Sequence, residues 1–372
     1  MSAKGYALTE SDLVPLSIGA AFLGTGGGGN PYLGMLRTRE VLRKGGTTRI
    51  VPLDLLPDEA WVGAVGGIGA PVIGFEKISE GGECFRAMRA VEEATGKKMS
   101  ALIPVEIGGA NAMAPIIAAA MAGLPVIDGD GMGRAFPEGQ MTTFAIYGGR
   151  REGPSALADD KGNVVVLQNA IDNLWRERLS RTITVAMGAG AGAATPPMKM
   201  EFVRRAAIPA TITQAIEIGR TVVDARAKRQ DVVSRVVEAT GGTLFFAGKI
   251  VDIKRELTGG FSRGHAVISG IDQWSGSEGR IAIQNENLVL WVDGNAVLTV
   301  PDLIINVELE TGEPLTTEVL RYGQRIAVVG LPAHELLKSQ KALAVVGPKA
   351  FGYPELEFKP LQFTTVETRK AD

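Results

Sequence analysis

Alternation of strand-like and helical segments over residues 49–128 constrains the fold of this chain more than any other feature. Strands that are joined through helices usually form a parallel sheet, because each helix returns the chain to the same edge. The strand-like runs lie at residues 49–53, 61–68, 100–106 and 125–128, with helical patterns between them at residues 82–95 and 110–121. We therefore predict an α/β fold with a mostly parallel sheet covered by helices.

The segments on either side of this alternation are also assigned from apolar spacing. Residues 11–23 are typical of a helix, with Ser11 as its N-cap. The middle of the chain mixes both patterns. We expect strands at residues 163–170 and 182–187, and helices at residues 198–207 and 208–227.

The pattern changes after about Thr240, where short alternating runs follow one another. They are separated by turn residues such as Asp293-Gly294-Asn295. Many short strands at even spacing indicate a small antiparallel barrel or sandwich. The runs lie at residues 243–253, 265–271, 280–290, 296–300, 303–307 and 325–329. We predict an α/β domain over residues 1–240 and a β-barrel-like domain over 241–330, with residues 331–372 as a tail that can return to the first domain.

Charge and composition exclude several classes of protein. The net charge of −2 is too small for a typical nucleic-acid binder, and there is no polybasic run for an anionic membrane. No segment approaches the roughly 20 apolar residues of a membrane span. A single cysteine, Cys84, excludes a disulfide framework within the chain. We expect a cytoplasmic protein that binds a small molecule and forms a homo-oligomer.

A run of glycines between two helices is the first candidate binding site. It consists of Gly26, Gly27, Gly28 and Gly29, flanked by Thr25 and Asn30. Backbone N–H groups in such a loop, together with the following helix N-terminus, can bind a phosphate, a carboxylate or an oxyanion. No Walker lysine follows the glycines, so a nucleotide site is the weaker interpretation.

Two further candidates follow predicted strands. Glu106 ends one strand and Asn111 opens the next helix, which places both where α/β sheets bind ligands. Asp128 and Asp130 follow the next strand, and alternate residues of an extended segment face the same way. This pair is a candidate acid–base couple or divalent metal site.

Polar residues after the aspartates extend the second candidate. Arg134 can hold a substrate carboxylate through two hydrogen bonds, and Glu138 is a further polar contact. Among the lone residues, His334 is a candidate catalytic group, whereas His265 and Cys84 are more typical of packing. Two histidines in the whole chain exclude a histidine-rich zinc site.

These motifs together resemble the S-methyl-thiohydantoin desulfurase-like family, whose members often accompany hydantoinase/oxoprolinase-type proteins. The resemblance extends from about residue 10 to residue 362. It is carried by residues 23–31, 106–111, 128–138 with Met141-Thr142, 261–264, and Gly347-Pro348 with residues 351–353. It implies a three-layer α/β domain with a β-barrel-like domain, and hydrolysis of a five-membered cyclic thiourea- or urea-like ring.

The reaction that this resemblance implies is hydrolysis of an S-methyl thiohydantoin to a hydantoin and methanethiol. Asp128, Asp130 or Glu106 can act as the general base, and glycine-loop N–H groups can stabilise the intermediate. A divalent metal is a possible cofactor, with Asp128 and Asp130 as its ligands. Two alternatives remain: a ligand-binding subunit of a hydantoinase/oxoprolinase-type partner, and a nucleotide- or phosphate-using enzyme.

Overall fold

The computed structural model describes residues 4–70, 73–149 and 153–362, and within them nine strands form one mixed sheet. The strand order is β1-β2-β5-β4-β3-β9-β7-β8, with β10 beside β3. The central strands β2, β5, β4 and β3 are parallel, as predicted, and antiparallel strands extend the sheet on both sides. The strands are β1 (Tyr6–Ala7), β2 (Arg49–Val51), β3 (Trp61–Gly69), β4 (Ala101–Pro104), β5 (Val126–Ile127), β7 (Ser155–Ala158), β8 (Val164–Leu167), β9 (Gly190–Ala194) and β10 (Met198–Lys199).

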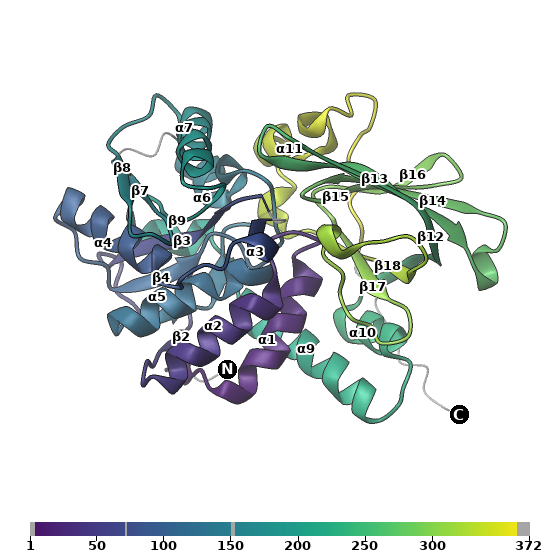
Figure 1. Cartoon of the computed structure of the whole chain (residues 1–372), viewed down its shortest axis with the longest axis horizontal. Coiled ribbons are helices and arrows are strands. Elements are labelled where there is room, and N and C mark those ends of the chain that lie inside the picture. The colour runs from purple at the N-terminus through teal and green to yellow at the C-terminus, as the bar shows by residue number, and fades with distance from the viewer. Residues whose placement is uncertain (1–3, 71–72, 150–152, 363–372) are drawn as a thin grey trace.

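Helices cover both faces of this sheet, which makes three layers (Figure 1). Consecutive strand residues alternate between two cores: Leu102 faces the core of the first helical layer and Ile103 the core of the second. The first layer holds α1 (Glu10–Leu23), α2 (Pro31–Arg43), α4 (Glu83–Thr95), α5 (Ala114–Ala122), α9 (Thr211–Ala227) and α10 (Val232–Thr240). The opposite face carries α6 (Thr143–Gly148), α7 (Asn173–Ala186) and α8 (Met200–Ala206). No helix among the described residues has the length and apolar character to cross a membrane.

Seven antiparallel strands in the described chain form a second, curled sheet. Their order is β16-β15-β14-β13-β12-β18-β17, and β15 contacts β17 across the curl, so the sheet forms a half-barrel. They are β12 (Thr243–Thr258), β13 (Phe261–Gly270), β14 (Glu278–Gln284), β15 (Glu286–Val292), β16 (Asn295–Thr299), β17 (Leu303–Glu308) and β18 (Arg325–Leu331). Figure 1 shows this half-barrel beside the α/β body, with β12, β13 and β14 on its outer side.

One predicted strand, residues 280–290, is in fact two. The chain reverses at Asn285, which has a left-handed backbone (φ +58°), so Gln284 pairs with Glu286. Asparagine tolerates this conformation better than most side chains. Both polar groups of Asn285 are held by Ser262 on β13: its backbone N–H donates to the Ser262 carbonyl and its Oδ1 accepts from the Ser262 N–H. The reversal therefore presents Glu286 at one end of the half-barrel.

A second strand prediction, residues 182–187, is wrong because these residues continue helix α7. Threonine and valine favour strands, but the hydroxyls of Thr182 and Thr184 donate to the carbonyls of Arg178 and Ser180, four residues earlier. In a helix, the threonine hydroxyl can reach the carbonyl four residues earlier, so these residues fit the helical turn. Tertiary packing of α7 on the sheet outweighs the local preference.

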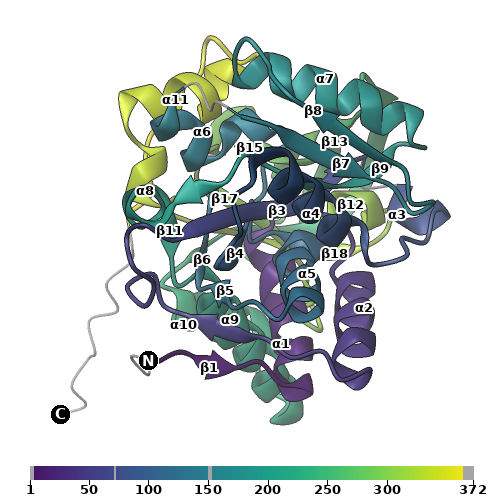
Figure 2. The same cartoon turned by 90° about the vertical axis from the view of Figure 1, so that its left-hand side faces the viewer.

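The C-terminal segment packs across the junction of the two bodies. Helix α11 (Gln340–Val346) contacts α6, and the hydroxyl of Tyr147 on α6 donates to the Leu336 carbonyl over 2.6 Å. The same apolar cluster includes Phe136 from the α/β body and Val289 from the half-barrel. Figure 2 shows α11 beside α6.

Candidate active site

A cavity of about 360 Å³ lies at the carboxyl ends of β3 and β4, where the α/β body meets the half-barrel. Parallel sheets bind ligands at this edge, because the loops after the strands are free to vary there. Its wall combines residues 66–70 after β3, Glu106 after β4, part of the glycine loop and helix α2. Segment 136–140, helix α7, helix α4, strands β7 and β9, and Asn285 with Glu286 also contribute to it.

Glu106 is a buried carboxyl group in this wall, 5% exposed. Its Oε1 accepts from the Asn111 side chain over 2.6 Å, and its Oε2 accepts from the Phe136 N–H over 3.1 Å. Burial raises the pKa of Glu106 to about 7, and the charge of Asp130 adds to this, while both hydrogen bonds and Arg134 oppose it. A carboxyl group that titrates near neutral pH can accept a proton from water and return it.

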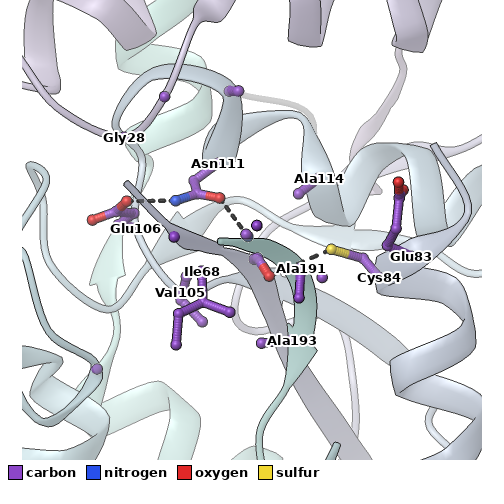
Figure 3. Close-up of a pocket in the computed structure, with 18 of the residues that line it drawn as sticks. Gly28, Ile68, Glu83, Cys84, Val105, Glu106, Asn111, Ala114, Ala191 and Ala193 are labelled. Carbon is purple, nitrogen blue, oxygen red and sulfur yellow. Dashed lines mark hydrogen bonds between the residues drawn. The ribbon is translucent and has the colours of Figure 1, made fainter. Parts of the chain in front are cut away.

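Asn111 fixes the orientation of Glu106 (Figure 3). The Asn111 Oδ1 accepts from the Gly67 N–H on β3 over 2.6 Å, so its Nδ2 must point toward the carboxylate. The side chain thus links the ends of two neighbouring parallel strands. The predicted neighbourhood of Glu106 and Asn111 is formed in the structure, and both residues line the cavity.

Two carbonyl groups at the start of the glycine loop accept hydrogen bonds from the half-barrel. The Thr25 carbonyl accepts from the Asn287 N–H over 2.9 Å, and the Gly26 carbonyl accepts from the Thr317 N–H over 2.8 Å. The Thr25 side chain is fully buried, and its hydroxyl has no hydrogen-bond partner among the described residues. This part of the loop, predicted to bind substrate, lies outside the cavity wall and joins the two bodies.

The second part of the loop, Gly28 to Asn30, reaches the cavity. Gly28 has a φ of +82°, and a Cβ there would lie 2.2 Å from the Gly108 carbonyl oxygen, so only glycine fits. The N–H groups of Gly28 and Gly29 donate to no other described residue. The Asn30 side chain accepts from the Leu33 N–H and caps helix α2. Free N–H groups at a helix N-terminus attract an anion.

Arg37, on the next turns of α2, is a cavity residue that the sequence analysis missed. It is half-buried and makes no hydrogen bond or ion pair with a described residue. The nearby carboxylate of Glu83 is already occupied, because it accepts from the N–H groups of Glu80 and Gly81. Arg37 is therefore available to an anion bound in the cavity, whose wall also includes Gly28 and Gly29.

Glu286 is the second cavity residue that the analysis missed. It comes from β15 of the half-barrel and is 2% exposed. Four consecutive polar residues, 284–287, interrupt an otherwise apolar run, and all four are buried. Burial of polar side chains costs free energy unless they form hydrogen bonds. A polar run inside an apolar strand pattern is therefore a sequence signal that could have identified Glu286.

Glu138 lies at another part of the wall, as predicted for a polar contact. Its Oε2 accepts from the Gln140 side chain over 2.6 Å. Burial raises the pKa of Glu138, and the charge of Glu177 adds to this. Glu177 itself forms an ion pair of 2.6 Å with Arg181.

The buried arginine of the acidic loop binds protein rather than substrate. The Arg134 guanidinium donates to the carbonyls of Asn287, Pro301 and Asp302 in the half-barrel and to its neighbour Ala135. It is fully buried and is not part of the cavity wall. The predicted grip on a substrate carboxylate is therefore corrected: Arg134 joins the two bodies.

Asp130 organises the turn beside Glu106. Its carboxylate accepts from the backbone N–H groups of Ile107, Met132 and Gly133, at 2.8 to 3.1 Å. Burial raises the pKa of Asp130 to about 7, although these hydrogen bonds oppose the shift. The residue is fully buried and lies behind Glu106, outside the cavity wall. Through the Ile107 N–H, it holds the backbone next to Glu106.

Asp128 points to a different element. Its carboxylate accepts from the N–H groups of Ile212 and Thr213, each over 3.1 Å, and from the Thr213 hydroxyl over 2.6 Å. It therefore caps the start of α9. The prediction that Asp128 and Asp130 face the same way is wrong, because β5 ends at Ile127, before both residues. The next strand, β6 (Gly129–Asp130), pairs with β11 (Ile208–Pro209) in a separate small sheet.

The predicted metal site does not fit these positions. Asp128 and Asp130 hold backbone N–H groups of different segments, and neither carboxylate faces the cavity. Among the described residues, no three or more His, Cys, Asp or Glu side chains are placed to hold a metal ion. We derive no step of the reaction through a metal.

The remaining lone residues have structural roles. The Nδ1 of His334 accepts from the Leu336 N–H over 3.2 Å and caps a short 3₁₀ turn, outside the cavity wall. Cys84 does line the cavity, but its thiol donates to the Gly66 carbonyl and burial raises its pKa to about 12 (Figure 3). A thiol with this pKa is a poor nucleophile at neutral pH.

Models of one protein family match nearly the whole chain. The S-Me-THD-like N-terminal domain matches residues 11–169 and the S-Me-THD-like C-terminal domain matches residues 171–361. The chain belongs to the S-Me-THD-like family. This confirms the family that the sequence motifs indicated. The border between the two S-Me-THD-like domains lies before α7, whereas the half-barrel begins with β12.

One solved structure shares the S-Me-THD-like fold of this chain. It is the crystal structure of a protein from Chromobacterium violaceum, with 23% sequence identity and a TM-score of 0.79. The match covers 96% of this chain and 100% of that one, so the two share both bodies of the fold. No curated protein sequence matches the chain.

Proposed function

We propose that this protein hydrolyses a five-membered cyclic substrate of the thiohydantoin or hydantoin type in the cavity beside Glu106. The observation that carries the proposal is the position of Glu106: a buried carboxyl group with a pKa of about 7, oriented by Asn111, in the wall of the cavity. The name of the family, which refers to S-methyl thiohydantoin, supports this class of substrate. The cavity of about 360 Å³ has room for such a ring.

Glu106 acts in this proposal as the general base. A water molecule lies between Glu106 and the ring carbon that bears sulfur. Its oxygen bonds to that carbon while Glu106 accepts its proton. The electron pair of the C=N bond moves to the ring nitrogen, which takes up a proton. The adduct then loses its hydroxyl proton and forms the carbonyl as the C–S bond breaks. Methanethiolate leaves with the proton held by Glu106, so the products are methanethiol and a hydantoin. Help from a positioned base is worth about 10²–10⁴-fold in rate.

Arg37 takes the role that the sequence analysis assigned to Arg134. An acidic substituent on the ring can bind its guanidinium and the N–H groups of Gly28 and Gly29, since these three residues line the cavity. These are charge-assisted hydrogen bonds in a partly buried site, where such bonds are stronger than in water. The substituent would hold the ring in one orientation relative to Glu106.

The test is turnover by the purified chain alone. S-methyl thiohydantoins with and without an acidic side chain are incubated in H₂¹⁸O, and methanethiol and the hydantoin are measured by mass spectrometry. We expect methanethiol release and one ¹⁸O atom in the new carbonyl. The variant Glu106→Gln should lose about 10²–10⁴-fold in kcat/KM, whereas Glu93→Gln, at an exposed position on α4, should keep its rate.

Two outcomes would overturn the proposal. Full activity of a folded Glu106→Gln protein would exclude Glu106 as the base. Absence of turnover with every ring, until a hydantoinase/oxoprolinase-type protein is added, would favour the ligand-binding subunit instead.

A further inference from the structure

Glu286 faces the same cavity as Glu106 but comes from the other body of the protein. The Asn285 reversal presents it, and Asn285 is held by Ser262 through two hydrogen bonds, so the position of Glu286 is set by the half-barrel. The half-barrel therefore adds a carboxyl group to a cavity that already holds Glu106 of the α/β body.

The glycine loop is shaped around the Glu286 carboxyl group. A Cβ on Gly27 would lie 2.0 Å from the Oε1 of Glu286, so any larger residue at position 27 would displace the carboxyl group. The Oε2 is buried and has no hydrogen-bond partner among the described residues. A buried oxygen without a partner costs free energy, which a ligand group in the cavity would recover.

The surroundings of Glu286 favour its neutral form. Burial raises its pKa well above the usual value, and the charge of Glu106 raises it further. Glu318 on the neighbouring turn acts in the same direction, while Arg134 opposes these effects. A carboxylic acid kept neutral in a buried site can donate a hydrogen bond or a proton.

We propose that Glu286 is the general acid of the reaction and protonates the ring nitrogen while Glu106 activates water. This inference rests on the proposed function. As the water oxygen bonds to the ring carbon, the electron pair of the C=N bond moves to nitrogen and takes the proton of Glu286. Glu106 receives the proton of water. The adduct then returns its hydroxyl proton to Glu286, and methanethiolate leaves with the proton held by Glu106, so both groups are restored.

The division of roles predicts different pH profiles. The wild-type rate should rise with pH as Glu106 loses its proton and fall at higher pH as Glu286 loses its own. Glu286→Gln should lower kcat/KM by about 10²–10⁴-fold and remove the alkaline fall, because glutamine does not titrate. Glu106→Gln should remove the acid rise instead. The protonated carboxyl group of Glu286 also has an infrared C=O band, which should be present in the wild type at a pH below the alkaline fall and missing in Glu286→Gln.

Glu318→Gln is a second test of the same inference. This substitution removes a charge that raises the pKa of Glu286, so the alkaline fall should move to lower pH. A merely structural effect would instead lower the rate at every pH. If Glu286→Gln does not fold, Glu286→Asp keeps the acid and should keep the alkaline fall at a lower rate.

A folded Glu286→Gln protein with the wild-type rate and pH profile would overturn the inference, as would absence of the infrared band in the wild type. Either result, together with loss of activity in Glu106→Gln, leaves the proposed function intact.

Discussion

The Nδ2 of Asn111 donates to the Oε1 of Glu106 over 2.6 Å. This bond stabilises the charged carboxylate, since a hydrogen bond to the ionised form lowers the pKa of an acid. Asn111 has no freedom to turn away, because its oxygen is held by the Gly67 N–H. The bond from Asn111 therefore keeps the pKa of Glu106 below the value that burial alone would give.

Replacement of Asn111 tests this relationship. In Asn111→Ala the pKa of Glu106 should rise above about 7, so the acid limb of the pH–rate profile should move to higher pH. The measurement is kcat/KM between pH 5 and 10, with thermal unfolding as a check on the fold. A uniform drop in rate with an unmoved acid limb would show that Asn111 only supports the backbone.

Strand periodicity predicted the central sheet, because the parallel strands and their helices are close in sequence and carry their own apolar pattern. The position of Glu106 and Asn111 follows from the same pattern, since the ends of parallel strands share one edge. These features depend on local sequence, and they are formed in the structure.

Contacts between the two bodies could not be predicted in this way. The Arg134 guanidinium donates hydrogen bonds to backbone carbonyls that lie more than 150 residues later in the sequence. Every residue has such a carbonyl, so the sequence does not show which ones Arg134 will contact. Glu286 reaches the cavity only because the half-barrel docks on the glycine loop. Asp128 and Asp130 were expected to act together. They belong to different strand pairings, and each carboxylate accepts hydrogen bonds from a separate set of backbone N–H groups.

The position of Asp128 makes a stability prediction. Asp128→Ala should leave the N–H groups of Ile212 and Thr213 without an acceptor at the start of α9, at a cost of about 1–3 kcal/mol in the free energy of unfolding. Catalysis should be unaffected, because Asp128 lies outside the cavity wall. Urea unfolding and kcat/KM at a permissive temperature measure the two effects. Loss of turnover with unchanged stability would show that Asp128 takes part in catalysis.

Cys84 makes a prediction about chemical reactivity. Burial raises the pKa of its thiol to about 12, so a thiol reagent such as Ellman's reagent should react slowly with the folded protein and fully after unfolding. Cys84→Ser should keep the rate within a few fold, since no covalent step on sulfur is involved. Rapid labelling of the folded protein together with inactivation would contradict this.

Arg37 makes a prediction about substrate selection. Its guanidinium lines the cavity without a partner among the described residues, so an acidic substituent on the ring is the group it should bind. Loss of a hydrogen bond to a charged group costs about 1.5–3 kcal/mol, which corresponds to roughly 10–100-fold in KM. Arg37→Gln should raise KM by this factor for a ring with a carboxylate side chain and leave a neutral ring unaffected. Arg43→Gln is the matched control, because Arg43 lies on the same helix but pairs with Glu10 at the surface. Equal losses with both substrates would show that Arg37 supports the fold of the cavity rather than the choice of substrate.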